Sequence, residues 1–143
     1  MGTDAKPAQA KLSQLINKLP AKAPPYLQSD YKNLVNKANQ LLSDLNELIS
    51  AEDKSARDRG DYPAKKQALA DLRKKINDAA TDQKSKVSEL IKEVRPLNVA
   101  ASGMLDTLKN KTSKEETALS TAILQFANSV QQLSGLEAPA PVD

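Results

Sequence analysis

The chain has 143 residues, of which 39% are hydrophobic and 27% are charged, and its net charge is +3. This size and composition suit one helical or globular domain and exclude a wholly disordered chain. The absence of His and Cys excludes imidazole bases, thiolate nucleophiles, disulfides and the metal sites built on those ligands. One Phe and three Tyr are too few for a base-stacking platform, which argues against nucleic acid as a partner.

Membrane insertion is not expected. No run of residues approaches the ~20 apolar positions that a spanning helix needs. The first six residues contain no apolar run of the kind found in signal peptides. We therefore expect a soluble chain, and the absence of Cys is compatible with either redox environment.

Prolines and glycines punctuate the chain and leave three long uninterrupted stretches, 26–59, 64–95 and 104–134. Each stretch has the apolar periodicity of a helix, and no alternation typical of strands competes with it. The predicted regions are a short helix with a Pro-rich connector over 1–26, a helical bundle over 27–135 and a disordered tail over 136–143.

The first two long stretches are predicted to be helices that face a bundle core. In the first stretch, apolar residues alternate at spacings of four and three, a sustained heptad. These residues are Leu27, Tyr31, Leu34, Ala38, Leu41, Leu45 and Leu48. The second stretch has Leu69, Leu72, Ile76, Ala79, Ala80, Val87, Leu90, Ile91 and Val94. Gln83 falls on the same face, which indicates either a buried polar residue that sets the register or an open end of the bundle.

The last stretch has two interpretations. Its two apolar faces are Ala101, Met104, Leu105 and Leu108, then Leu119, Ile123, Phe126, Val130 and Leu133. The residues between these faces are polar throughout. Two capping-box patterns occur there, Thr112 with Glu115 and Ser113 with Glu116. Either pattern would start a new helix; alternatively, one helix runs over 98–134.

Heptad helices joined by short connectors pack antiparallel at shallow angles. We therefore predict an all-α fold, an elongated antiparallel up-down helical bundle of three long helices plus a short N-terminal amphipathic helix. The bundle gains a fourth helix if the last stretch breaks near 110–114. A wide apolar seam can close within one chain or with a second copy, so the oligomeric state is left open.

Arg59, Gly60 and Asp61 form a tripeptide that resembles the integrin-recognition motif. An Asp oxygen suits a divalent cation held by a receptor, and an Arg guanidinium suits carboxylates. A protruding turn between the first two long helices would display both groups. In a purely structural interpretation, Gly60 ends one helix and Asp61 caps the next. One alternative function is therefore a cell-adhesion ligand for an integrin-type receptor.

Basic residues flank the apolar face of the second long helix. Lys66, Arg73 and Lys84 form one row, called here the basic row. Lys75 and Lys86 form a row on the other side. Acidic residues are interleaved with both rows, so the basic row is either a surface for an anionic partner or a solvated flank whose stems cover the core edge.

A short amphipathic helix is predicted near the N-terminus, before the stiff connector Pro24-Pro25. Its apolar face is Leu12, Leu15, Ile16 and Leu19, and Lys11, Lys18 and Lys22 add positive charge. Because basic amphipathic helices bind anionic bilayers, residues 8–22 support a second alternative function, a peripheral membrane-binding element.

Carboxylate pairs occur at Asp44 with Glu47, at Glu89 with Glu93 and at Glu115 with Glu116. They lie off the apolar faces, and the chain has no His to complete a di-metal site of the helical-bundle type. No glycine-rich phosphate loop is present. We therefore expect no catalytic residue, no metal and no cofactor.

The favoured function is a non-enzymatic helical-bundle module that presents a helix face or a loop to another protein. The sequence leaves the identity of that protein open. Modules of this kind are often units of larger secreted, surface or scaffold proteins, so a secreted or surface location is favoured by this association.

Overall fold

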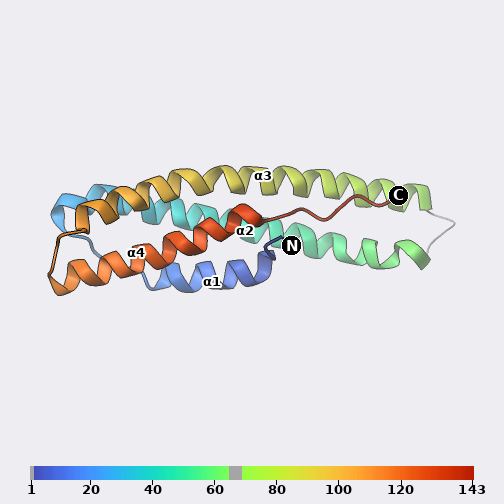
Figure 1. Cartoon of the computed structure of the whole chain (residues 1–143). Helices are drawn as coiled ribbons and strands as arrows, with labels where there is room; N and C mark the ends of the chain where they lie inside the picture. The colour runs from blue at the N-terminus through green and yellow to red at the C-terminus, as the bar shows by residue number, and fades with distance from the viewer. Residues whose placement is uncertain (1, 65–68) are drawn as a thin grey trace.

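The computed structural model describes residues 2–64 and 69–143. Apart from connectors and one isolated bridge, these residues are helical, which confirms the predicted all-α bundle (Figure 1). The α-helices are α1 (Ala5–Asn17), α2 (Gln28–Asp61), α3 (Leu69–Leu108) and α4 (Lys114–Gln132). The 3-10 helices are η1 (Pro25–Leu27), η2 (Tyr62–Ala64) and η4 (Leu133–Gly135).

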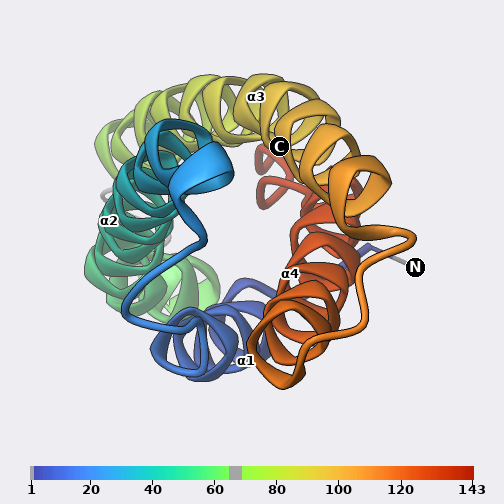
Figure 2. The same cartoon turned by 90° about the vertical axis from the view of Figure 1, so that its left-hand side faces the viewer.

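The four α-helices lie side by side in a ring (Figure 2). Packed neighbours are α1 with α2, α2 with α3, α3 with α4, and α4 with α1. This is the arrangement of an up-down bundle, in which each helix contributes one apolar stripe to a shared core. The short helix α1 completes the ring, as the docked fourth element of the predicted bundle.

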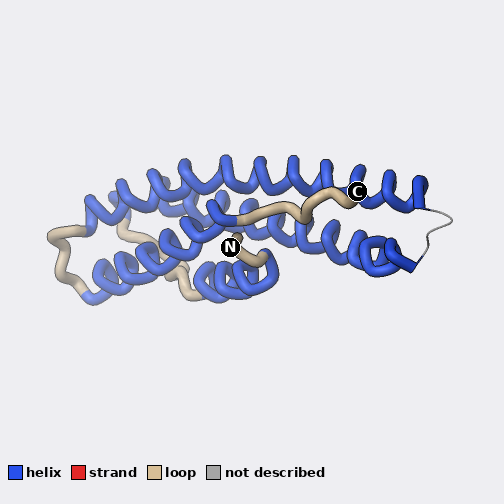
Figure 3. The backbone as a smooth tube through the Cα atoms, turned by 45° about the vertical axis from the view of Figure 1, so that its right-hand side comes forward, coloured by secondary structure: helices blue, strands red, loops and turns tan. Residues whose placement is uncertain are grey.

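Helices α2 and α3 are much longer than the other two. They have 34 and 40 residues, against 13 in α1 and 19 in α4. At 1.5 Å per residue this is about 50–60 Å against about 20–30 Å. The two long helices therefore continue past α1 and α4 as a two-helix extension (Figure 3). We call residues 51–61 with 69–86 the arm, and the four-helix remainder the body.

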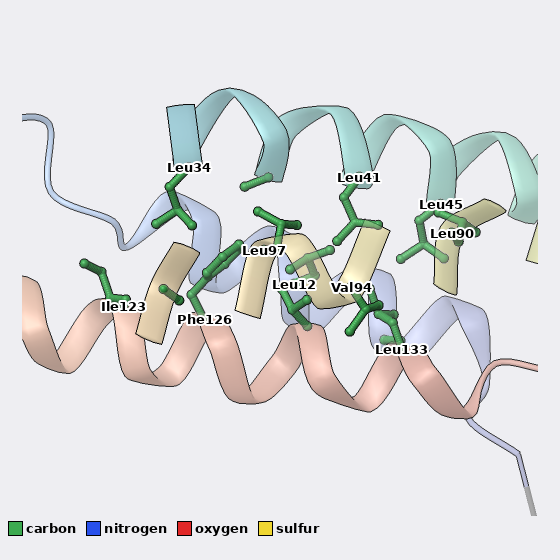
Figure 4. Close-up of a cluster of buried hydrophobic side chains, with 14 of the residues drawn as sticks. Leu12, Leu34, Leu41, Leu45, Leu90, Val94, Leu97, Ile123, Phe126 and Leu133 are labelled. Atoms are coloured by element: carbon green, nitrogen blue, oxygen red, sulfur yellow. The ribbon is translucent and has the colours of Figure 1, made fainter. Parts of the chain in front are cut away.

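The core of the body is mainly aliphatic, with Phe126 and Tyr31 as aromatic residues, and Figure 4 shows Phe126 among the aliphatic side chains. Its largest fully buried side chains are Phe126, Leu12, Leu34, Leu41, Leu45, Leu48, Leu90, Leu97, Leu119, Ile123 and Leu133. Each buried Leu or Ile contributes about 1.5–3 kcal/mol of transfer free energy. Packing of these side chains therefore holds the four helices together.

Helix α3 runs through Pro96, whereas the sequence analysis separated two helical stretches at this residue. Proline removes a backbone donor and normally breaks a helix. Here Val94 and Leu97 are buried on either side, so the apolar stripe continues without interruption. Pro96 itself lies on the exposed side of α3. Burial of the continuous stripe outweighs the loss of one solvent-facing hydrogen bond.

The last stretch does break, between Leu108 and Lys114, as one of the two interpretations predicted. Ser113 is the N-cap of α4, and its Oγ accepts a hydrogen bond of 3.1 Å from the backbone N–H of Glu116. The Glu116 carboxylate accepts from the backbone N–H of Ser113, which completes the capping box. The Tyr26 hydroxyl also donates to Glu116, so η1 is tied to the start of α4.

Residues 136–143, called here the terminal segment, extend from η4 along α3 toward the arm (Figure 1). This differs from the disordered tail expected from the sequence. Leu136 is only 4% exposed and belongs to the core. Pro139 and Pro141 prevent helix formation but are compatible with an extended chain. The segment therefore occupies the position along α3 that α4 would take if it continued.

Candidate functional site

A groove of about 750 Å³ lies between α3 and the terminal segment. The α3 wall consists of Ala80, Thr81, Lys84, Val87, Ser88, Ile91 and Lys92. Residues 136–141 form the opposite wall. The wall formed by the terminal segment is mainly apolar, because alanine, proline and Leu136 dominate it, whereas the α3 wall combines three aliphatic residues with four polar or charged ones. The groove begins where α4 has ended, so no helix fills it.

Asn77 holds the far end of the terminal segment by its backbone. Its Nδ2 donates to the carbonyl of Val142 at 2.9 Å, and the N–H of Val142 donates to its Oδ1 at 2.7 Å. A side-chain amide offers one donor and one acceptor, as the backbone of a neighbouring strand does. Asn77 therefore binds Val142 through main-chain atoms alone, so these bonds do not depend on which side chain the bound residue has. Tyr62 in η2 donates its hydroxyl to the carbonyl of Asp143.

The near end of the segment is fixed to the body. Thr3 forms a parallel bridge with Leu136, and its backbone N–H donates to the carbonyl of Gly135 at 2.7 Å. A Cβ on Gly135 would lie 2.7 Å from Oγ1 of Thr3, so this close approach needs glycine. The terminal segment is thus attached at two places, with residues 137–141 crossing the groove between them.

One residue of the basic row, Lys84, borders this groove. Arg73 and Lys84 are exposed, and their separation of 11 residues is about three helical turns, which places them on one face. Lys84 lines the groove. The terminal segment carries the acidic residues Glu137 and Asp143, so the charges of the two sides are complementary. Lys66 lies outside the described residues.

The other basic row lies along a second groove, of about 500 Å³, between α2 and α3 of the arm. There Lys75 pairs with Asp58 at 3.2 Å, and Lys86 pairs with Asp82 at 3.5 Å. Such partly exposed ion pairs are worth little individually. This groove is lined mainly by charged and polar residues, whereas the groove beside the terminal segment has more aliphatic side chains and prolines.

The tripeptide Arg59, Gly60 and Asp61 forms the last turn of α2 and does not lie in a protruding turn. Gly60 has no positive φ, so it does not end the helix by left-handed geometry. Helical geometry turns the side chains of Arg59 and Asp61 about 200° apart. Nε and Nη2 of Arg59 are buried without a hydrogen-bond partner in the described part of the chain. Asp61 Oδ2 lies 3.8 Å from Nε of Arg57.

The apolar face of α1, considered above for membrane binding, is turned into the bundle. Ala5, Ala8, Leu12 and Leu15 are buried, and α1 packs on α2 and α4. An apolar face must be accessible if it is to enter a bilayer. In this structure the face is covered. Among the described helices, moreover, not one combines the length and the apolar character needed to cross a bilayer.

Carboxylates meet between α2 and α3, where Glu93 and Asp44 share a hydrogen bond. Burial, followed by this contact and the charge of Asp44, raises the pKa of Glu93 to about 7. The sequence analysis paired Glu93 with Glu89, whose charge makes the smallest of these contributions. Over residues 2–64 and 69–143, no group of three or more acidic side chains converges as a metal site would require.

The chain matches no protein-family model, no curated protein and no solved structure. Its function is therefore inferred from the geometry of the arm and its grooves. Sequence reasoning missed Asn77, because a partly exposed Asn on a helix flank has no distinctive spacing. It also missed the order of the terminal segment. The available signal was Leu136, which continues the apolar spacing of Val130 and Leu133.

Proposed function

We propose that this chain is a non-enzymatic protein-interaction module, one unit of a larger secreted, surface or scaffold protein, and that it binds its partner through the arm. The arm adds little to the hydrophobic core. Four of its residues are buried between α2 and α3, and two of these, Ser55 and Gln83, are polar, whereas Ile76 and Ala80 are apolar. Its two grooves, by contrast, offer lateral surfaces of the kind that partner segments occupy.

The observation that carries this proposal is the terminal segment on α3. An extended stretch of chain already lies along the arm, held by backbone hydrogen bonds to Asn77. The α3 surface therefore has the shape and the hydrogen-bonding groups that bind a peptide. Among the described residues, no segment of the chain lies in the second groove. This groove is therefore accessible to a partner.

Site-specific photo-crosslinking tests the arm as the binding surface. A photoreactive amino acid is placed at Lys54, which lines the second groove, and at Val99, which is 64% exposed on the body and serves as the matched control. We expect a crosslinked partner from position 54 and none from position 99. The purified partner should then bind the unlabelled chain, and the charge reversal Lys75→Glu should weaken that binding at least tenfold. Crosslinks from position 99 alone would refute the arm as the interface.

The adhesion alternative receives less support from this geometry, because Arg59 and Asp61 do not face one surface. It stays open to a direct test with Asp61→Glu, which keeps the charge but lengthens the side chain. Cell adhesion to the immobilised protein that depends on Asp61 and on divalent cations would favour an integrin-type receptor. The membrane alternative would be favoured by flotation of the chain with anionic vesicles at low salt.

A further inference from the structure

We infer that the α3 face beside Asn77 is a binding site for an extended, proline-containing segment of a partner protein, and that the terminal segment of this chain is its displaceable occupant. This inference rests on the proposed function and names the chemistry of the partner. Four features of the structure support it. They are the hydrogen bonds to the main chain of the segment, the groove beside the segment, the charge and conformation of the segment, and its attachment to the body at Leu136.

The segment is held by its main chain. Asn77 donates one hydrogen bond to the backbone of Val142 and accepts one from it, and Tyr62 donates to the main-chain oxygen of Asp143. Every extended peptide presents the same groups at the same spacing. A segment of another protein that follows the same path can therefore form the same bonds.

The segment leaves part of the α3 surface uncovered. An open groove of about 750 Å³ runs alongside it, and the residue of the segment that packs on the core there is Ala138, which has a single methyl group. Apolar walls that do not meet lose dispersion contacts. A partner with a larger apolar side chain at the position of Ala138 would fill this space and bind better than the chain's own segment.

Charge and conformation further define the partner. Lys84 and Lys92 line the groove, so an acidic residue near the start of the partner segment, like Glu137, is favoured. Prolines such as Pro139 and Pro141 restrict a peptide to extended conformations and reduce the entropy lost on binding. The expected partner is thus an apolar, proline-containing peptide with at least one acidic residue.

The attachment of the segment allows exchange. Leu136 is buried in the body, but Ala140 and Asp143 are exposed, and Val142 is only partly buried. Release of Val142 from Asn77 would uncover α3 while Leu136 stays in place. A tethered segment competes at an effective concentration in the millimolar range, so a partner peptide binds measurably only if it fits better or if the tethered segment is weakened.

The test measures binding of two fluorescein-labelled, amidated octapeptides by fluorescence anisotropy. One has the sequence of residues 136–143, Leu-Glu-Ala-Pro-Ala-Pro-Val-Asp, and the other has Leu in place of its first Ala. The protein is the full chain with Val142→Pro, which removes the N–H that donates to Asn77 and so weakens the tethered segment. We expect this variant to bind both peptides at least fivefold more tightly than the unchanged chain, with the Leu peptide at least threefold tighter than the other.

The role of Asn77 is measured in the same Val142→Pro chain, because Asn77 holds the tethered segment as well. Asn77→Leu should weaken peptide binding at least tenfold. The matched control is Asn98→Leu, also on α3, whose side chain contacts Gln131 and not the segment, and it should change binding less than twofold. If Asn77→Leu unfolds the chain, Asn77→Asp keeps the acceptor and should give an intermediate loss.

Three results with the peptides would overturn the inference: equal binding of a peptide with the reversed sequence, no dependence on Asn77, or no binding at millimolar peptide. A dimer of the Val142→Pro chain that the peptide dissociates would assign the groove to a second copy and so overturn the assignment to a partner. If the peptides fail while position 54 crosslinks a partner, this inference falls and the proposed function stands. If the peptides bind while crosslinks come only from position 99, the arm still binds an extended peptide beside Asn77, and only the second groove is excluded as a partner contact.

Discussion

The hydroxyl of Thr3 donates a hydrogen bond of 2.9 Å to the backbone carbonyl of Gln132, in the last turn of α4. The backbone N–H of the same residue donates to the carbonyl of Gly135. Carbonyl groups at the end of a helix have no partner within that helix. Thr3 satisfies two of them, and in doing so it ties the beginning of the chain to the point where the terminal segment leaves the body.

Alanine is expected to change the stability of the chain in opposite directions at Gly135, which lies against Thr3, and at Gly103, which does not. In Gly135→Ala the new Cβ would lie 2.7 Å from Thr3 Oγ1, so the Thr3 bond to Gln132 is lost and the free energy of unfolding decreases by about 1 kcal/mol. In Gly103→Ala, inside α3, a Cβ meets nothing within 4 Å, and alanine should stabilise by about 0.5–1 kcal/mol. Urea unfolding monitored by circular dichroism measures both. Equal effects at the two sites would contradict this account of Thr3.

The buried amide of Gln83 is expected to cost stability. Gln83 is 1% exposed, and its Nε2 donates to Ser55 Oγ and to the carbonyl of Ala51. Its Oε1, however, is buried and has no hydrogen-bond partner among residues 2–64 and 69–143. Gln83→Leu removes this atom, while Ser55 still donates to the carbonyl of Glu52. We expect Gln83→Leu to raise the free energy of unfolding by about 1 kcal/mol.

The matched variant for that prediction is Gln83→Ala, which leaves a cavity and should destabilise the chain by about 2 kcal/mol. Both values come from chemical denaturation with unchanged m-values. Destabilisation by Gln83→Leu of the same size as by Gln83→Ala would show instead that the hydrogen bonds to α2 hold the arm together.

Glu93 should make stability fall as pH rises. Its pKa is raised from 4.5 to about 7 by burial and by Asp44. Below pH 4.5 it is protonated in the folded and unfolded states and has no effect. As pH rises from 4.5 to 7, the unfolded state releases the proton while the folded state retains it, so the free energy of unfolding decreases. Because Glu93 is partly exposed, the loss is on the order of 1 kcal/mol.

Denaturation at pH 5 and pH 8 tests this dependence. Glu93→Gln should remove most of the difference between the two pH values and should stabilise the chain at pH 8. Glu89→Gln, one turn away on α3, should retain most of it. A pH dependence that survives Glu93→Gln unchanged would mean that other groups cause it.

Pro96 lies in the interior of α3 and leaves the carbonyl of Lys92 without its helical donor. Pro96→Ala restores this donor and should raise the free energy of unfolding by about 1–3 kcal/mol. Thermal and urea unfolding measure the effect. A decrease would indicate that the proline ring is needed for packing on the exposed side of α3.

Much of the fold follows from the heptads. The spacing from Tyr31 to Leu48 predicted the buried face of α2, and Ser113 with Glu116 predicted the start of α4. The end of α3 was misplaced because local helix-breaking rules were applied at Pro96. The buried spacing of Val87, Leu90, Val94, Leu97 and Ala101 is uninterrupted, and burial over several turns outweighs one missing hydrogen bond.

The candidate site was less accessible to sequence reasoning. Lys84 of the predicted basic row lines the proposed groove on α3, and its role in binding stays a prediction. The pairing of Asn77 with Val142 joins residues 65 positions apart, and no local pattern encodes such a contact. It depends on where α4 ends relative to α3, and therefore on helix lengths and on the packing of the body.

The terminal segment is attached to the arm by a few bonds that follow one another along the segment, to Asn77 on α3 and then to Tyr62 in η2. A pull on residue 143 away from α3 would load the bonds from Tyr62 and Asn77 in succession, so each would break alone at low force. A pull along the axis of α3 would load them together and meet greater resistance. In both cases the force would be transmitted to the body only after these bonds had broken, through Leu136 and its bridge to Thr3. The mechanical strength of the attachment is therefore set by the direction of the applied force.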